Sequence, residues 1–72
     1  MKKIKKIKIK VNGKVKSISE KYKLSDLIKT LNIPLKKVAI ELNQEIIDKK
    51  SISKINLNKN DNIEIVHFIG GG

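Results

Sequence analysis

Several residue types that carry much of protein chemistry are missing or scarce in this 72-residue chain. It contains no cysteine, which excludes disulfides, zinc–thiolate sites and a cysteine nucleophile. Its single histidine, His67, leaves no ordinary histidine metal cluster and no histidine-based catalytic triad. Tyr22 and Phe68 are the only aromatic residues, too few for a platform on which nucleic-acid bases stack. The sequence therefore predicts no metal site and no catalytic site of these kinds.

Long apolar stretches are absent as well. No run approaches the length of a membrane span. The lysine-rich N-terminus lacks the apolar core of a signal peptide. We therefore expect a soluble, cytoplasmic protein that does not bind membranes, folded as one small domain that buries roughly 60% of its unfolded surface.

Arginine is also absent, so all seventeen basic residues are lysines, and with seven acidic residues the formal net charge is +10. A strongly positive charge favours contact with nucleic acids. Bidentate recognition of bases and phosphates, however, favours arginine over lysine. The lysines are spread along the chain, and only Lys2 to Lys10 forms a run. A nucleic-acid-binding module is therefore the weaker alternative, since charge alone supplies only non-specific affinity.

An N-terminal β-hairpin is predicted by alternating apolar residues. In residues 7–11 isoleucine and valine alternate with lysine, the period of a half-buried strand. Asn12-Gly13 is a strong hairpin signal, because both residues tolerate positive φ. The return strand covers about residues 14–18. The register of the two strands stays open. A two-residue loop would place Val11 opposite Lys14, whereas a three-residue loop would place Val11 opposite Val15.

One short helix is expected at about residues 25–31. Leucine and isoleucine recur there at spacings of three and four, which gives the helix one apolar face. Ser25 is predicted to cap the N-terminus, and Asp26 suits the positive end of the helix dipole. Asn32 can take the left-handed closing position, and Pro34 prevents continuation. Because so short a helix does not persist alone, it needs a sheet beneath it.

Three further strands follow the helix. Residues 38–42 alternate as a strand does, and Asn43-Gln44 is a plausible tight turn, although glutamine fits positive φ poorly. A short strand at 45–47 is followed by an irregular segment at 48–58, in which Ile52, Ile55 and Leu57 are expected to pin the loop to the core. A turn at 58–62 then leads to the last strand, 63–68. The order ββαβββ predicts an α+β domain, a mixed sheet of about five strands with one main helix on one face. In such a domain the first and last strands can lie side by side and parallel.

The chain ends in Gly70, Gly71 and Gly72, three of its four glycines. Glycine loses the most freedom on ordering and buries no side chain, so these residues stabilise no fold. We therefore expect residues 70–72 to form a flexible tail on a domain that spans 1–69. A tail without Cβ atoms can lie extended in a narrow channel and deliver the α-carboxyl group of Gly72 to another protein's active site. The alternative is an ordinary frayed end.

Over nearly its whole length the chain resembles the ubiquitin-like β-grasp sulfur carriers, and most closely the ThiS sulfur carriers of thiamine biosynthesis. The similar stretches are residues 9–13, 24–28, 38–43, 45–47 and 61–66, followed by the terminal glycines. Terminal Gly-Gly is common to related carriers. Residues 38–47 and the closing strand are what favour ThiS over the small subunit of molybdopterin synthase. Gln44 and Asn60 stand where this family commonly has glycine, a departure that affects only turn geometry.

This resemblance implies a carrier and not an enzyme. An E1-like activating enzyme, ThiF, would use ATP and Mg²⁺ to adenylate the carboxylate of Gly72. A sulfur donor such as a cysteine desulfurase would supply the sulfur of a thiocarboxylate, which thiazole synthase, ThiG, would use to build the thiazole of thiamine. The carrier itself would bind no cofactor. The alternatives within this chemistry are molybdopterin synthesis and another sulfur-transfer pathway.

The last strand is expected to dock on these partners. If Ile63 and Ile65 face the helix, the pleat places Glu64, Val66 and Phe68 on the opposite sheet face. Val66 and Phe68 would then form an exposed apolar patch beside the tail, and such patches mark partner sites. The alternative for Phe68 is local packing at the end of the strand.

Overall fold

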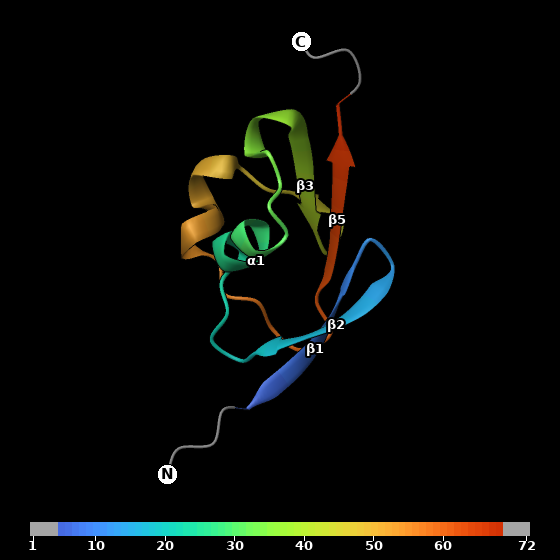
Figure 1. Ribbon diagram of the computed structural model, residues 1–72, viewed down its shortest axis with the longest axis vertical. Coiled ribbons are helices and arrows are strands. Elements are labelled where there is room, and N and C mark those ends of the chain that lie inside the picture. The colour runs from blue at the N-terminus through green and yellow to red at the C-terminus, as the bar shows by residue number, and fades with distance from the viewer. Residues whose placement is uncertain (1–4, 69–72) are drawn as a thin grey trace.

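The computed structural model describes residues 5–68 and shows a mixed five-stranded sheet with one helix packed on one face (Figure 1). The elements are β1 (Lys6–Val11), β2 (Lys14–Ser19), α1 (Leu24–Thr30), the 3₁₀ turn η1 (Leu35–Lys37), β3 (Val38–Leu42), β4 (Glu45–Ile46), the 3₁₀ turn η2 (Lys49–Lys54) and β5 (Asn62–His67). The strand order is β2-β1-β5-β3-β4, with β1 and β5 parallel and the other neighbours antiparallel. The predicted α+β fold and its ββαβββ order are confirmed.

The first hairpin has the two-residue loop that the sequence left open. Val11 pairs with Lys14, which rules out the three-residue alternative. Asn12 and Gly13 have φ values of 50° and 83°, the left-handed conformation that a tight hairpin turn of this type requires. The Asn12 side chain also accepts a hydrogen bond from the Ile65 N–H at 2.7 Å, so the turn is tied to β5.

The N-terminus of α1 differs from the prediction. The helix begins at Leu24, and Lys23 is its N-cap, so the assignment of Ser25 as the cap was wrong. Leu24 is fully buried, and this burial draws the first helical residue into the core one position earlier than the polar pattern suggests. The Asp26 carboxylate reaches back and accepts a hydrogen bond from the Lys23 N–H at 2.9 Å. The Leu24 N–H donates to the Ile55 carbonyl at 2.9 Å, so Asp26 and a neighbouring loop, and not a serine hydroxyl, accept from N–H groups at this end of the helix.

The C-terminus of α1 follows the prediction. Asn32 has a φ of 55°, in the left-handed region. Its N–H donates to the Lys29 carbonyl at 3.0 Å, and the Ile33 N–H donates to the Ile28 carbonyl at 3.2 Å. This pair of bonds is the Schellman motif, which satisfies carbonyls that the helix leaves open.

The core lies between the sheet and a layer made by α1 and η2. The buried apolar residues are Ile9, Ile18, Leu24, Leu27, Ile28, Val38, Ile40, Ile52, Leu57, Ile63 and Ile65. Ile52 anchors η2 in the core, as the sequence predicted, whereas the 3₁₀ conformation of this segment was not predicted. None of the helical segments in residues 5–68 has the length and apolar character that crossing a membrane would need.

Two turns at the start of β5 are joined by a polar cluster around Asp61, which is 8% exposed. The Asp61 carboxylate accepts hydrogen bonds from the Asn43 side-chain amide at 3.0 Å and from the Asn58 N–H at 2.7 Å. The Asn43 side-chain oxygen in turn accepts from the Asn62 N–H at 2.9 Å. These bonds fix the position at which β5 begins, and they therefore help to fix the direction of the strand.

Candidate functional site

The candidate site lies where β5 ends. This strand sits between β1 and β3 and runs toward one end of the molecule, away from the start of β1 (Figure 1). Its last residue is His67, and Phe68 is the last residue that the structure describes. The predicted site residues Gly70, Gly71 and Gly72, and the domain boundary before them, lie outside the described residues. Their roles stay predictions.

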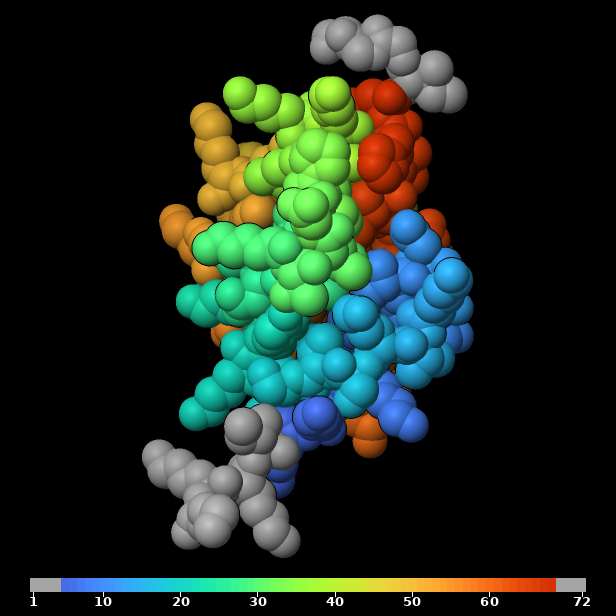
Figure 2. Space-filling model, in the orientation of Figure 1, coloured from blue at the N-terminus to red at the C-terminus, as the bar shows by residue number. Residues whose placement is uncertain are grey.

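Phe68 is held between η1 and η2. Its N–H donates to the Lys37 carbonyl at 2.9 Å, one position beyond the last strand pair, Val38 with His67. The space-filling view shows the end of β5, in red, against the yellow-green segment that includes η1 (Figure 2). The Lys49 ammonium nitrogen lies 5.4 Å from the centroid of the Phe68 ring. The phenyl ring is nevertheless 56% exposed, so it has both a local contact and a free surface.

The pleat of β5 alternates as the sequence predicts. Ile63 and Ile65 are 0% and 7% exposed and belong to the core. Glu64 is exposed, and Val66 is 52% exposed, on the sheet face that α1 does not cover. The geometry needed for docking through this face is therefore present, while the docking role of Glu64, Val66 and Phe68 stays a prediction.

Ile46 on β4 extends this exposed surface and was missed by the sequence reasoning. It is 77% exposed and pairs with Glu41, which pairs in turn with Glu64. Ala39 pairs with Val66 in the neighbouring row. We call Ala39, Ile46 and Val66 the open-face patch. The signal that could have found Ile46 is the predicted two-residue turn Asn43-Gln44, because pairing the strands through that turn places Ile46 opposite Glu41 on this face.

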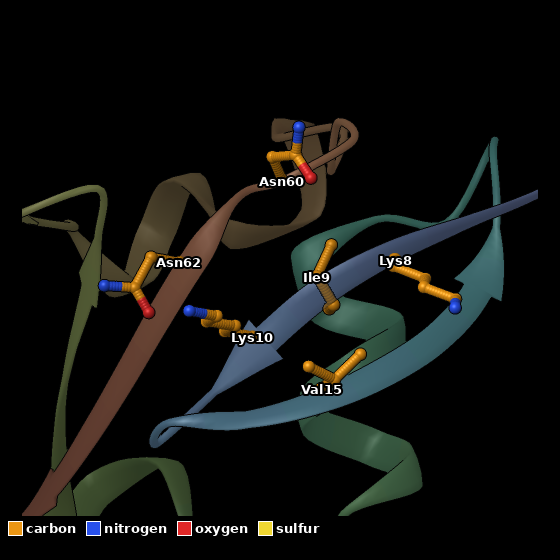
Figure 3. A pocket seen from close by; sticks show the side chains of 6 residues that line it. All are labelled: Lys8, Ile9, Lys10, Val15, Asn60 and Asn62. Carbon is orange, nitrogen blue, oxygen red and sulfur yellow. The ribbon is translucent and has the colours of Figure 1, made fainter.

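A shallow pocket is lined by residues of β1 and β2 and by Asn60 and Asn62, and its polar side chains do not converge on one point. In the close-up, Lys8 and Lys10 extend in different directions along β1, and only Lys10 reaches toward Asn62 (Figure 3). Within residues 5–68, no group of three or more histidine, cysteine, aspartate or glutamate residues is placed to hold a metal ion. The end of β5 is therefore the candidate site that the geometry supports best.

Comparison with known proteins gives consistent results. The model of the ThiS family matches residues 9–72. Over 65 residues the chain is 40% identical to the sulfur carrier protein ThiS of Bacillus subtilis, covering 89% of this chain and 98% of that protein. The crystal structure of the thiamine biosynthesis protein (ThiS) from Geobacter metallireducens matches with a TM-score of 0.80 at 26% identity, covering 92% of this chain and 100% of that one.

Two longer proteins also match. The chain is 38% identical over 66 residues to a thiazole synthase of Paramagnetospirillum magneticum and 35% identical over 66 residues to one of Magnetococcus marinus. These matches cover 92% of this chain in each case but only 20% of each thiazole synthase. The chain thus spans about a fifth of the length of these two relatives.

Proposed function

The chain belongs to the ThiS family, and on that premise we propose that it is a sulfur carrier of thiamine biosynthesis. The observation that carries the proposal is the family match over residues 9–72, which includes the terminal glycines. The β-grasp fold supports it, because β5, the strand nearest in sequence to that terminus, is the central strand of the sheet and ends at His67. In this function the chain is a substrate of other enzymes and not itself an enzyme.

The reactive group is the α-carboxylate of Gly72. A carboxylate is a resonance-stabilised anion and resists nucleophiles, so it must first receive a leaving group. ThiF, with ATP and Mg²⁺, would join it to AMP as a mixed anhydride and release pyrophosphate. Sulfide would displace AMP and leave the thiocarboxylate directly. The persulfide sulfur of a donor such as a cysteine desulfurase would displace AMP to give an acyl disulfide, which a thiol would then reduce by two electrons to the thiocarboxylate. Activation of this kind divides one difficult step into two easier ones.

The residues around the tail suit this chemistry. Four residues follow Phe68, and an extended segment of that length reaches about 13–14 Å. That reach carries the carboxylate clear of the domain and into a partner's active site, while Gly70 and Gly71 place no Cβ atom in the channel. Docking would use Glu64, Val66 and Phe68, since exposed apolar side chains beside a reactive terminus favour a protein interface.

Thiazole synthase, ThiG, is the proposed acceptor of the sulfur. Proteins named thiazole synthase contain a segment similar to this chain. Joining a carrier to its acceptor in one polypeptide raises their effective concentration, which is useful only if the two act together. This relationship favours thiamine biosynthesis over molybdopterin synthesis. Because activation consumes ATP, we place the carrier in the cytoplasm.

Mass spectrometry tests the proposal. After incubation with ThiF, ATP, Mg²⁺ and a sulfide source, the intact chain should gain the mass of one oxygen-to-sulfur exchange, located at Gly72. The Bacillus subtilis ThiS protein serves as the positive control, and a variant that lacks Gly71 and Gly72 serves as the negative control. No mass change in this chain, when the positive control is converted, would contradict the proposal. Transfer of the sulfur to thiazole synthase, and not to molybdopterin synthase, would identify the pathway.

A further inference from the structure

Phe68 is positioned by contacts that lie outside strand β5. The ladder between β3 and β5 ends at the pair Val38 with His67. Beyond it, the Phe68 N–H donates to the Lys37 carbonyl at 2.9 Å, which fixes the backbone of Phe68. The side chain has a separate contact, with the Lys49 ammonium nitrogen 5.4 Å from the ring centroid. The described chain therefore ends in a residue whose backbone and ring are held by two different segments.

Lys49 itself stands on a well-anchored backbone. It is the first residue of η2, whose N-cap is Asp48. The Asp48 carboxylate accepts from the Lys50 N–H at 3.0 Å, and the Asp48 carbonyl accepts from the Ser51 N–H at 2.8 Å. Ile52 of the same turn is 9% exposed and belongs to the core. The ammonium group is thus presented from a segment that the core holds in place.

An ammonium group near an aromatic ring is attracted by the negative face of the ring. Phe68 is 56% exposed and is not part of the core, so the contact with Lys49 supplies an orientation for the ring that core packing does not. The ring belongs to the residue from which the tail starts. A Phe68 that is held in one orientation gives the tail a fixed starting point.

We propose that Lys49 is a positioning residue for the tail, acting through the ring of Phe68. This inference rests on the proposed function as a sulfur carrier. If Phe68 is already ordered before docking, less conformational freedom is lost when the tail enters a partner's active site. The contact should therefore lower the KM of the activating enzyme for the carrier and leave kcat unchanged.

Three substitutions separate this role from general effects of charge. Lys49→Met removes the ammonium group but keeps a long unbranched side chain. Lys49→Arg keeps a cation that can stack on the ring. Lys50→Met removes the neighbouring exposed charge, and the hydrogen bond from its backbone N–H to Asp48 is retained. Circular dichroism and thermal unfolding establish that all three variants are folded.

The assay is ATP–pyrophosphate exchange by ThiF with the carrier concentration varied. An exposed cation–π contact of typical strength corresponds to a rise in KM of about two- to fivefold for Lys49→Met. Lys49→Arg and Lys50→Met should stay close to wild type. In a Phe68→Leu background, Lys49→Met should have no further effect on KM, because the ring through which Lys49 acts is gone.

Nuclear magnetic resonance gives a readout that needs no enzyme. The ε-methylene protons of Lys49 should show a ring-current shift that Phe68→Leu abolishes. A wild-type KM in Lys49→Met, an equal rise in Lys50→Met, or an effect that persists in Phe68→Leu would each overturn the inference. Exchange activity of the wild-type carrier separates the two claims. Its absence would overturn the proposed function and the inference with it, whereas normal exchange unaffected by Lys49→Met overturns only the inference.

Discussion

Replacing Asn12 tests how the first hairpin holds the strand that leads to the tail. Asn12 has a φ of 50°, and its side-chain oxygen accepts a hydrogen bond from the Ile65 N–H at 2.7 Å. At this level β1 has ended, so the side chain of Asn12 provides the partner that a strand would otherwise provide. Ile65 is only 7% exposed, and an unpaired N–H there would be costly.

Two variants separate the hydrogen bond from the backbone conformation. Asn12→Gly keeps a residue that accepts positive φ but removes the acceptor, and leaving a buried donor unpaired costs about 1–3 kcal/mol. Asn12→Ala also forces an alanine into the left-handed region, which adds about 1–2 kcal/mol. For a domain of this size each kcal/mol lowers the Tm by about 4–8 °C. Urea and thermal unfolding measure both losses.

Asn60→Gly is the matched control. Asn60 also has a positive φ, 69°, and its backbone N–H donates to the Lys8 carbonyl at 2.8 Å, a bond that glycine retains. Its change in unfolding free energy should stay within about 0.5 kcal/mol. Hydrogen exchange should show faster exchange of the Ile65 amide in Asn12→Gly and no change there in Asn60→Gly. If Asn12→Gly is as stable as wild type, or the Ile65 amide stays equally protected, the reasoning is refuted.

Three further predictions concern the tail, a turn and the sheet face. Gly71→Val should fold with an unchanged Tm but be adenylated much more slowly by ThiF, and wild-type turnover would count against a threaded tail. Gln44→Gly should raise the unfolding free energy by up to about 1 kcal/mol, because Gln44 has a φ of 73°; a loss of stability in urea unfolding would contradict this. Glu64→Gln should raise stability by about 0.2–1 kcal/mol, since Glu64 faces Glu41 across the strands. The same variant should raise the KM for ThiF if Glu64 docks, and an unchanged KM would remove it from the interface.

The strands and turns of this fold could be predicted because local chemistry determines them. Alternation of apolar residues and lysine marks β1, and Asn12-Gly13 supplies the two positive φ values of its turn. Asn32 closes α1 in the left-handed conformation, as its small polar side chain allows. At each of these positions the local preference and the tertiary structure agree, so a single sequence is sufficient.

Positions where tertiary packing competes with local preference could not be predicted. Ser25 has the better capping side chain, yet the helix begins at the buried Leu24, which makes Lys23 the N-cap, and the Asp26 carboxylate accepts from the Lys23 N–H. The turn η2 has no periodic pattern, so its 3₁₀ conformation was not predicted, although Ile52 was expected to reach the core and does so. The contact between Lys49 and Phe68 joins η2 to the end of β5, two segments far apart in the sequence, and no local pattern in the sequence indicates it.

The proposed chemistry makes unequal demands on this fold. The proposed sulfur transfer places its demands on the terminal carboxylate and on the docking residues near the end of β5, so most of the remaining surface is unconstrained and can carry many of the seventeen lysines. What the fold must supply is a fixed position and direction for β5. Asp61 helps to hold the start of the strand and Asn12 holds its middle, and each side chain accepts a hydrogen bond from a backbone N–H group. Loss of either should therefore act on the carrier by loosening β5, and the defect in sulfur transfer should follow the loss of stability.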